Sequence, residues 1–283
     1  MQCEWNAFLN LLPPWIREDA DRMGKENLQE LRLRIGGKAE LKCLKDSKWL
    51  PRMITEEDIS YCVNAASRYS PWAASSVSRG YITARGGHRL GLCGDATVLD
   101  GTMKGYRSFS SVCLRVARDF PGIGQELISL TGSSLIIGVP GCGKTTLLRD
   151  FIRMQSDIGE RTVSVVDERG ELFPYGSCGF CFPTGKRTDV LTGCEKLVGI
   201  NVVLRNMTPE IIAVDEITAG EDCTALLQAG WCGVDILATA HASSKEDLFN
   251  RKLYQPIVKS GLFQNLIVLQ KDKSYRVERM GMQ

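Results

Sequence analysis

The chain has 283 residues, 43% of them hydrophobic and 24% charged, which is typical of a soluble globular protein with one large or two smaller domains. A formal net charge of +2 excludes a general electrostatic attraction to nucleic acid or acidic membranes. No apolar stretch approaches the roughly 20 residues of a membrane span, and the polar, proline-broken start does not resemble a signal peptide. We therefore expect a protein that is soluble when made alone and peripheral to any membrane it serves.

The first part of the chain, residues 1–120, is predicted to form an α+β domain. A helix is expected over 55–70, because Thr55 is a suitable N-cap and apolar residues recur behind it at helical spacing. A hairpin is expected around Gly86 and Gly87. Short strands are expected over the ranges 30–37, 39–44 and 111–119.

The second part, residues 121–283, has a different rhythm. Residues 119–130 contain proline and two glycines and are expected to be a linker. Apolar strands then alternate with helices, which predicts a parallel sheet with helices on its faces. The strands expected are 134–138, 162–167, 210–217 and 235–241, the helices 145–156 and 222–230, and a closing hairpin begins at 265.

A phosphate-binding loop is the strongest motif. "GVPGCGKT", residues 138–145, matches the Walker A pattern and lies between an apolar strand and a helix. Glycines let backbone N–H groups wrap a phosphate chain at the positive end of the helix. Lys144 is expected to reach the β- and γ-phosphates of ATP. The predicted nucleotide-binding residues are Gly138, Pro140, Gly141, Cys142, Gly143, Lys144, Thr145 and Thr146.

A Walker B pattern follows in "EIIAVDEI", residues 210–217. Asp215 is expected to hold Mg²⁺ together with the Thr145 hydroxyl, and Glu216 to polarise the attacking water. An acidic turn after a strand would explain the same letters. The segment lies roughly seventy residues after a complete P-loop, and this position favours the Walker B interpretation.

Two further strand ends carry polar side chains. Asp167, Glu168 and Arg169 end one strand, and His241 ends another. Because the carboxyl ends of parallel strands converge on the ligand crevice of such a sheet, these side chains are candidates for catalysis near the γ-phosphate. Solvated strand ends, and a plain loop position for the histidine, remain open alternatives.

Together these motifs resemble the secretion ATPase superfamily, the hexameric motors of type II and type IV secretion and type IV pili. That family carries a Walker A, an acidic box, a Walker B and a histidine box in this order, matched here by "GVPGCGKTT", "VVDERGE", "IIAVDEI" and "ATAHA". The resemblance implies an α/β fold, with a RecA-like P-loop NTPase domain after a smaller α+β domain. It also implies a Mg-dependent ATPase that works as a homo-hexamer.

Three other segments, "GKRTDVLTGCEK", "GHRLGLCGDATV" and "SVCLRVARD", are similar to the stage III sporulation AA family of endospore-forming bacteria. This implies a motor at the cytoplasmic face of the mother-cell membrane that energises or assembles a channel to the forespore. Its partners would be the membrane proteins of that channel. The chain departs from the usual pattern at Thr218, where glycine is usual, and at Glu195, where proline is common.

Ring ATPases commonly complete the site with an arginine from a neighbouring subunit or domain. Arg187 is the favoured candidate because "RTD" belongs to the family pattern, and Arg89, Arg115 and Arg118 are alternatives. A surface charge is the simpler explanation for any one of them.

Two other functions compete with the motor. A nucleic-acid-dependent ATPase would use the basic residues Lys271, Lys273, Arg276 and Arg279, although acidic residues dilute the patch and no aromatic series accompanies it. A non-hydrolysing ATP-binding scaffold need not retain Glu216. Zinc binding by Cys178, Cys181 and Cys194 is disfavoured, because four ligands are needed and no second close pair or histidine follows. With 11 scattered cysteines, we expect reduced thiols.

Overall fold

The computed structural model describes residues 1–43, 46–67, 77–176 and 179–280. These residues form two compact units. Unit 1 contains Met1–Asp119 and Pro174–Phe182, and unit 2 contains Phe120–Phe173 and Pro183–Gln283. Within the described ranges, no helix is both long and apolar enough to cross a membrane.

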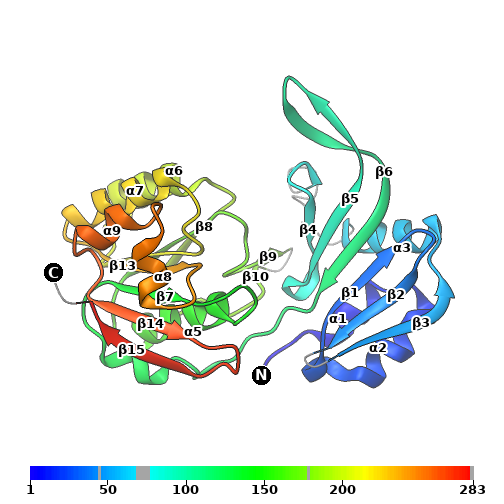
Figure 1. The fold of residues 1–283 in the computed structure, drawn as a ribbon, viewed down its shortest axis with the longest axis horizontal. Helices are drawn as coiled ribbons and strands as arrows, with labels where there is room; N and C mark the ends of the chain where they lie inside the picture. The colour runs from blue at the N-terminus through cyan, green and yellow to red at the C-terminus, as the bar shows by residue number, and fades with distance from the viewer. Residues whose placement is uncertain (44–45, 68–76, 177–178, 281–283) are drawn as a thin grey trace. The chain divides into compact units, whose positions relative to one another are not determined.

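Unit 1 is built on a six-stranded antiparallel sheet in the order β3-β2-β1-β6-β5-β4 (Figure 1). The predicted hairpin at Gly86 and Gly87 is confirmed, since both residues have a positive φ and their turn joins β4 to β5. The predicted strands are found as β1, β2 and β6. The strands are β1 (Leu28–Arg34), β2 (Lys38–Cys43), β3 (Ser47–Met53), β4 (Tyr81–Thr83), β5 (Arg89–Leu99) and β6 (Thr102–Arg115).

Within the described residues of unit 1, three α-helices accompany this sheet. The predicted helix is α3 (Glu56–Ser67), and residues 68–70 of its expected range lie outside the described residues. Thr55 caps it as predicted: the Asp58 N–H donates to Thr55 Oγ1, and the Thr55 N–H donates to Asp58 Oδ2. The sequence prediction lacked α1 (Trp5–Asn10) and α2 (Pro14–Asn27), whose proline start suits the first helical position. Fully buried members of the core between helices and sheet include Phe8, Ile16, Leu31, Ile59 and Leu114.

Pro174–Phe182 belongs to unit 1 although it lies far along the chain. It contains two short paired strands, β9 (Tyr175–Gly176) and β10 (Gly179–Phe180). It packs on the turn η1 (Arg85–Gly87), where a Cβ atom at Gly87 would lie only 3.0 Å from Pro174 Cγ. The predicted division at residue 120 placed this segment in the second domain, because its few residues carry no periodicity of their own.

Unit 2 contains a seven-stranded sheet in the order β11-β8-β12-β13-β7-β14-β15. All neighbouring strands are parallel except β15, which closes the edge as the predicted antiparallel hairpin. The strands are β7 (Ser134–Ile137), β8 (Val163–Asp167), β11 (Thr188–Thr192), β12 (Ile211–Val214), β13 (Asp235–Ala240), β14 (Asn265–Leu269) and β15 (Tyr275–Arg279).

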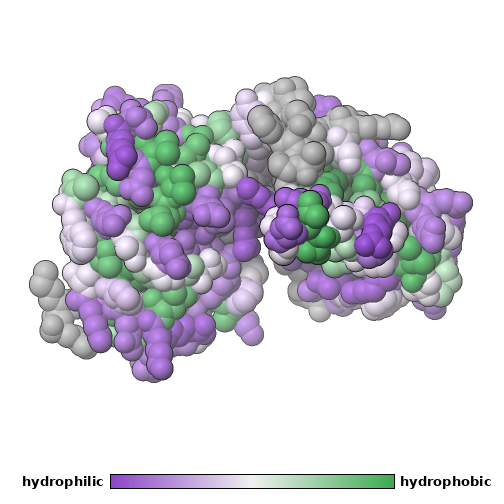
Figure 2. Space-filling view, turned by 90° about the horizontal axis from the view of Figure 1, so that it is seen from above, coloured by the Kyte–Doolittle hydropathy of each residue, from purple (hydrophilic) through white to green (hydrophobic). Residues whose placement is uncertain are grey.

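Helices cover both faces of this sheet, as the strand–helix alternation predicts (Figure 1). The predicted helices are α5 (Lys144–Asp157) and α7 (Gly220–Trp231); the others are α6 (Lys196–Asn206), α8 (Lys245–Asn250) and α9 (Gln255–Lys259). One apolar core lies between α6, α7 and α9 and alternate residues of the strands. Figure 2 shows apolar areas on the surface of unit 2, and exposed apolar side chains there include Val198, Val202 and Trp231.

The segment predicted to be a linker, residues 119–130, is from Phe120 onward a folded part of unit 2. Asp150 in α5 accepts hydrogen bonds from the backbone N–H groups of Gly122 and Gly124, at 3.1 and 2.7 Å. The short helix η2 (Gln125–Ser129) follows, with Leu127 fully buried. The glycines therefore permit a tight approach to a buried carboxylate rather than flexibility.

Candidate nucleotide site

The P-loop begins directly after β7 and ends in the first turn of α5. Gly143, with φ +107°, is the N-cap of α5, and Gly141 also has a positive φ. Gly138 is required for a different reason: a Cβ atom there would lie 2.5 Å from Cys142 Sγ and 2.8 Å from the Leu269 carbonyl oxygen. The loop therefore has the open backbone and helix end that an anion-binding site needs.

Lys144 connects this loop to His241, which follows β13, the strand beside β7 in the sheet. Its buried ammonium donates to the carbonyl oxygens of Gly138 (2.9 Å) and Val139 (3.2 Å). It also donates to His241 Nδ1 at 3.0 Å. Burial lowers the pKa of Lys144, and the nearby carboxylates of Asp215 and Glu216 oppose that shift. A partly desolvated cation of this kind is poised to exchange its neutral partners for an anion.

His241 in turn contacts the predicted catalytic base. An ammonium group has only N–H donors, so His241 Nδ1 must accept from Lys144. The proton then resides on Nε2, which lies 2.9 Å from Glu216 Oε1 and donates to it. The structure therefore brings three predicted residues into one chain of contacts, Lys144–His241–Glu216, although they come from different strand ends.

Asp215 is held by two hydroxyl groups. Thr145 Oγ1 donates to its Oδ2 at 2.7 Å, and Thr239 Oγ1 donates to its Oδ1 at 2.6 Å. Thr145 and Asp215 are thus adjacent, as their expected shared role with Mg²⁺ requires. Hard oxygen donors, a hydroxyl and a carboxylate beside a phosphate-binding loop, are the ligand set that Mg²⁺ prefers. The residues present fit a Mg-nucleotide.

Thr239 also fixes the backbone of Glu216. Glu216 has φ +53°, a left-handed conformation that non-glycine residues rarely adopt and that has a free-energy cost of about 1–3 kcal/mol. Its N–H donates to the fully buried Thr239 Oγ1 at 2.8 Å. Sequence reasoning did not single out Thr239. The available signal was its spacing of two from His241, which places both side chains on the same face of a strand.

The acidic strand end after β8 has a different arrangement. Asp167 is buried and accepts the backbone N–H groups of Glu171 and Phe173, each at 2.9 Å. Burial raises its pKa to about 6, and the charge of Asp215 adds to the shift. Asp167 thus shapes its own loop beside Asp215. Arg149 in α5 holds the same loop by donating to the carbonyl oxygens of Glu171 and Leu172.

Glu168 and Arg169 face the same hollow as Asp215 and Glu216. Arg169 lies 3.6 Å from Glu216 Oε2. Glu168 pairs at 2.8 Å with Lys196, a buried lysine at the start of α6 that sequence reasoning missed. The acidic side chains at this hollow are therefore paired with cations of the same chain, Arg169 and Lys196.

The candidate arginines lie elsewhere. Arg187 precedes β11, and β11 pairs with β8 so that Thr192 is opposite Asp167. Arg187 therefore lies at the amino-terminal end of the parallel strands, whereas the nucleotide site lies at their carboxyl-terminal end. There Arg187 donates to the Glu160 carbonyl oxygen. It does not reach the site of its own chain.

In unit 1, Arg118 donates to the carbonyl oxygens of Lys25 and Leu28 at the end of α2. Arg115 lies 3.7 Å from Glu30, and the Arg89 guanidinium lies 4.0 Å from the centre of the Tyr81 ring. Each of these arginines thus has a structural contact within unit 1.

Both departures from the family pattern are accommodated locally. The left-handed residue of the Walker B loop is Glu216, so Thr218 needs no glycine-like freedom, and its N–H donates to Asp222. Glu195 is the N-cap of α6 with φ −56°, within the range that proline fixes. Neither departure disturbs the predicted phosphate or metal ligands.

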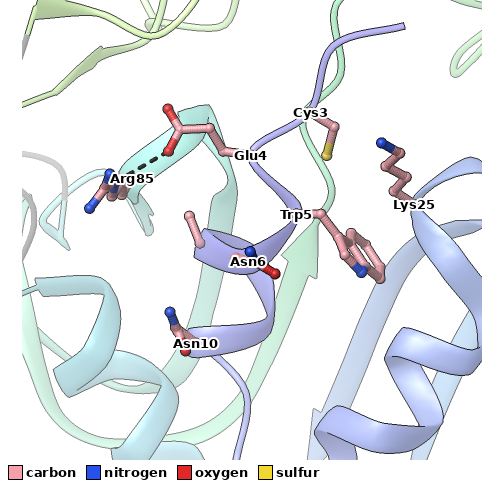
Figure 3. A pocket seen from close by; sticks show the side chains of 8 residues that line it. Cys3, Glu4, Trp5, Asn6, Asn10, Lys25 and Arg85 are labelled. Atoms are coloured by element: carbon pink, nitrogen blue, oxygen red, sulfur yellow. Dashed lines mark hydrogen bonds and ion pairs between the residues drawn. The ribbon is translucent and has the colours of Figure 1, made fainter.

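Unit 1 has a hollow of its own, lined by residues that belong to none of these motifs (Figure 3). Its lining includes Cys3, Trp5, Asn6 and Lys25, and Arg85 pairs there with Glu4 at 3.2 Å. Within the described part of the chain, no cluster of histidine, cysteine, aspartate or glutamate side chains could hold a metal ion by itself. Cys178 of the "CGFC" pair lies outside the described residues.

Comparison with known proteins identifies the family. The family model for sporulation stage III, protein AA matches residues 7–279. Stage III sporulation protein AA of Bacillus subtilis (strain 168) is 35% identical over 285 residues, which cover 95% of this chain and 92% of that protein. The chain belongs to the sporulation stage III protein AA family. The protein named seedling plastid development 1 of Arabidopsis thaliana is 28% identical over 90% of this chain and 36% of its own length.

Solved structures show the same fold. The Legionella pneumophila ATPase DotB has a TM-score of 0.59 at 16% identity, covering 95% of this chain and 80% of DotB. The pilus retraction motor PilT has a TM-score of 0.57 at 16% identity, covering 89% of this chain and 76% of PilT. This member of the stage III protein AA family therefore has the α/β, RecA-like fold of secretion ATPases, as the sequence predicted.

Proposed function

We propose that this chain is a Mg-dependent ATPase motor that works as a homo-hexameric ring. In the spore-forming cell it would energise or assemble the channel between mother cell and forespore. It would act at the cytoplasmic face of the mother-cell membrane, with the membrane proteins of that channel as partners. The observation that carries the proposal is the contact chain Lys144–His241–Glu216 beside the Thr145–Asp215 pair.

Each residue has a separate task in this mechanism. The P-loop backbone and Lys144 bind the β- and γ-phosphates, while Thr145 and Asp215 would hold Mg²⁺, which neutralises phosphate charge. Glu216 orients the attacking water and accepts its proton. His241 links the phosphate-binding Lys144 to Glu216, so a change of partners at Lys144 alters the position of the base.

Three substitutions test the proposal. Lys144→Ala should abolish productive ATP binding. Glu216→Gln should bind ATP but turn it over at least ~100-fold more slowly, the usual scale for a catalytic base. His241→Ala should also bind ATP, with a smaller loss of rate, because it positions the base without replacing it. Nucleotide affinity and turnover are measured side by side, with Glu221→Gln, an exposed glutamate in α7, as the control.

The outcomes separate the competing functions. Near-normal hydrolysis by Lys144→Ala would refute the site assignment. Normal hydrolysis by Glu216→Gln would move the base elsewhere, with Glu168 as the next candidate. ATP binding without turnover in the wild type would favour the non-hydrolysing scaffold. Strong, salt-sensitive stimulation by DNA or RNA would favour the nucleic-acid-dependent ATPase.

A further inference from the structure

Lys273 lies on the P-loop although it belongs to the C-terminal hairpin. Its Nζ donates to the Gly141 carbonyl oxygen at 2.9 Å. A Cβ atom at Gly143 would lie 3.9 Å from Lys273 Cδ and 4.0 Å from its Nζ. The side chain is exposed and has two further N–H donors on its ammonium group. One lysine of the basic segment identified in the sequence, Lys273, therefore lies beside the P-loop of the nucleotide site.

The turn between β14 and β15 is built to hold Lys273 in place. Lys273 has φ +76°, a left-handed conformation that is strained for a residue with a side chain. The Lys273 N–H donates to the Gln270 carbonyl oxygen, and Asp272 Oδ1 accepts both the N–H and the hydroxyl of Ser274. A strained residue fixed by its neighbours is a feature that functional sites share.

The strand order says which end of a nucleotide Lys273 faces. The P-loop follows β7, which lies between β13 and β14. Glu216 follows β12 and His241 follows β13, so the side chains expected at the γ-phosphate lie on one side of the loop. β14 lies on the other side of β7 (Figure 1), and Lys273 is in the turn that follows β14. The phosphate chain ends at the first side, and the ribose and base must extend away from it.

We propose that Lys273 binds the nucleoside end of the nucleotide, with its aliphatic stem against the base and its ammonium group on a ribose oxygen. This inference rests on the proposed nucleotide site and adds a contact that Walker motifs do not contain. A lysine can serve both purposes, because its four-carbon stem covers apolar surface while its charged end stays in water.

The test compares three ligands on Lys273→Ala by isothermal titration with Mg²⁺ present. Loss of one charge-assisted contact should weaken ATP and ADP by the same factor, about 10-fold. Inorganic tripolyphosphate, which has no ribose or base, should bind as it does to the wild type. Lys271→Ala, in the same exposed turn, is the matched control and should change none of these values.

Two outcomes overturn the inference. Equal weakening of tripolyphosphate would mean that Lys273 only braces the P-loop through Gly141. Unchanged ATP and ADP affinity would mean that it makes no ligand contact. Failure of the proposed function is distinguishable, since wild-type protein that binds nucleotide without hydrolysing it still gives a readable result, and wild-type protein that binds no nucleotide refutes the site itself.

Discussion

At the scale of single residues, Thr239 is the clearest addition to the motif set. One buried hydroxyl donates to Asp215 and accepts from the strained backbone of Glu216. It thereby ties the expected metal ligand and the expected base to the strand that carries His241. Removal of the hydroxyl would leave the Glu216 N–H without its acceptor. It would also leave Asp215 Oδ1 without its donor, so that the carboxylate could rotate.

We therefore predict that Thr239→Val reduces kcat by at least about 10-fold, because Glu216 loses the hydrogen bond that holds its backbone and the base is no longer positioned for the attacking water. A 10-fold loss corresponds to a barrier that is higher by about 1.4 kcal/mol. ATP affinity should remain within a few-fold of the wild type, since the P-loop is unchanged. Thr239→Ser keeps the hydroxyl and should recover most of the rate. If Thr239→Val folds and turns over ATP normally, the hydroxyl does not position the base.

At the scale of elements, the second histidine of the chain joins three segments of unit 1. His88 is fully buried, and its Nδ1 accepts the Ala117 N–H at 3.0 Å. Its Nε2 therefore carries the proton and donates to the Glu4 carbonyl oxygen at 3.0 Å. The start of the chain, the turn before β5 and the residues after β6 are thus held by one neutral imidazole.

Burial lowers the His88 pKa from 6.5 to about 4. Between these values the unfolded chain binds a proton that the folded chain excludes, so the stability of unit 1 should fall as the pH decreases from 6.5 to 4. The loss should reach about 3 kcal/mol and then level off. The measurement is hydrogen-exchange protection of β6 amides as a function of pH.

The control for this prediction is His88→Gln, whose amide can accept and donate in place of the two ring nitrogens. Carboxylates also titrate in this range, so the difference between the two proteins isolates the histidine. A parallel decline of protection in wild type and variant would show that His88 does not contribute.

At the scale of the whole molecule, Arg187 decides whether the site is complete in one chain. It lies at the amino-terminal end of the parallel strands, whereas the nucleotide site lies at their carboxyl-terminal end. If Arg187 contributes to catalysis, it must therefore come from a neighbouring chain. Head-to-tail contacts between identical chains form a ring when the rotation between neighbours closes, and a ring is the assembly that the proposed motor requires.

We predict that Arg187→Ala and Lys144→Ala are each inactive alone and recover turnover when mixed. A site with intact Lys144 can then receive intact Arg187 from its neighbour. At equal amounts, on the order of a quarter of neighbouring pairs combine both intact groups, which sets the expected recovery relative to wild type. Electron microscopy of Glu216→Gln with ATP should show closed rings. Absence of recovery in mixed rings would exclude Arg187 as a residue acting between chains.

Local sequence determined much of this protein. The P-loop, the Walker B strand and the strand–helix alternation were all predictable, because each depends on short-range spacing and on the burial of apolar strands between helices. The contact between Thr145 and Asp215 also followed, since strand ends of a parallel sheet meet at one edge.

Only the tertiary structure decided which side chains meet. Lys196 and Lys273 join the site through contacts between segments far apart in the chain, and no periodicity marks them. For Thr239 the spacing of two from His241 indicated the strand face, but its contacts with Asp215 and Glu216 depend on the neighbouring strand. Pro174–Phe182 joins unit 1 for the same reason, because it packs on Gly87, which lies far from it in the chain. Local spacing sets the elements, whereas the strand order sets the neighbours of each strand end, and that order is fixed by packing over the whole sheet.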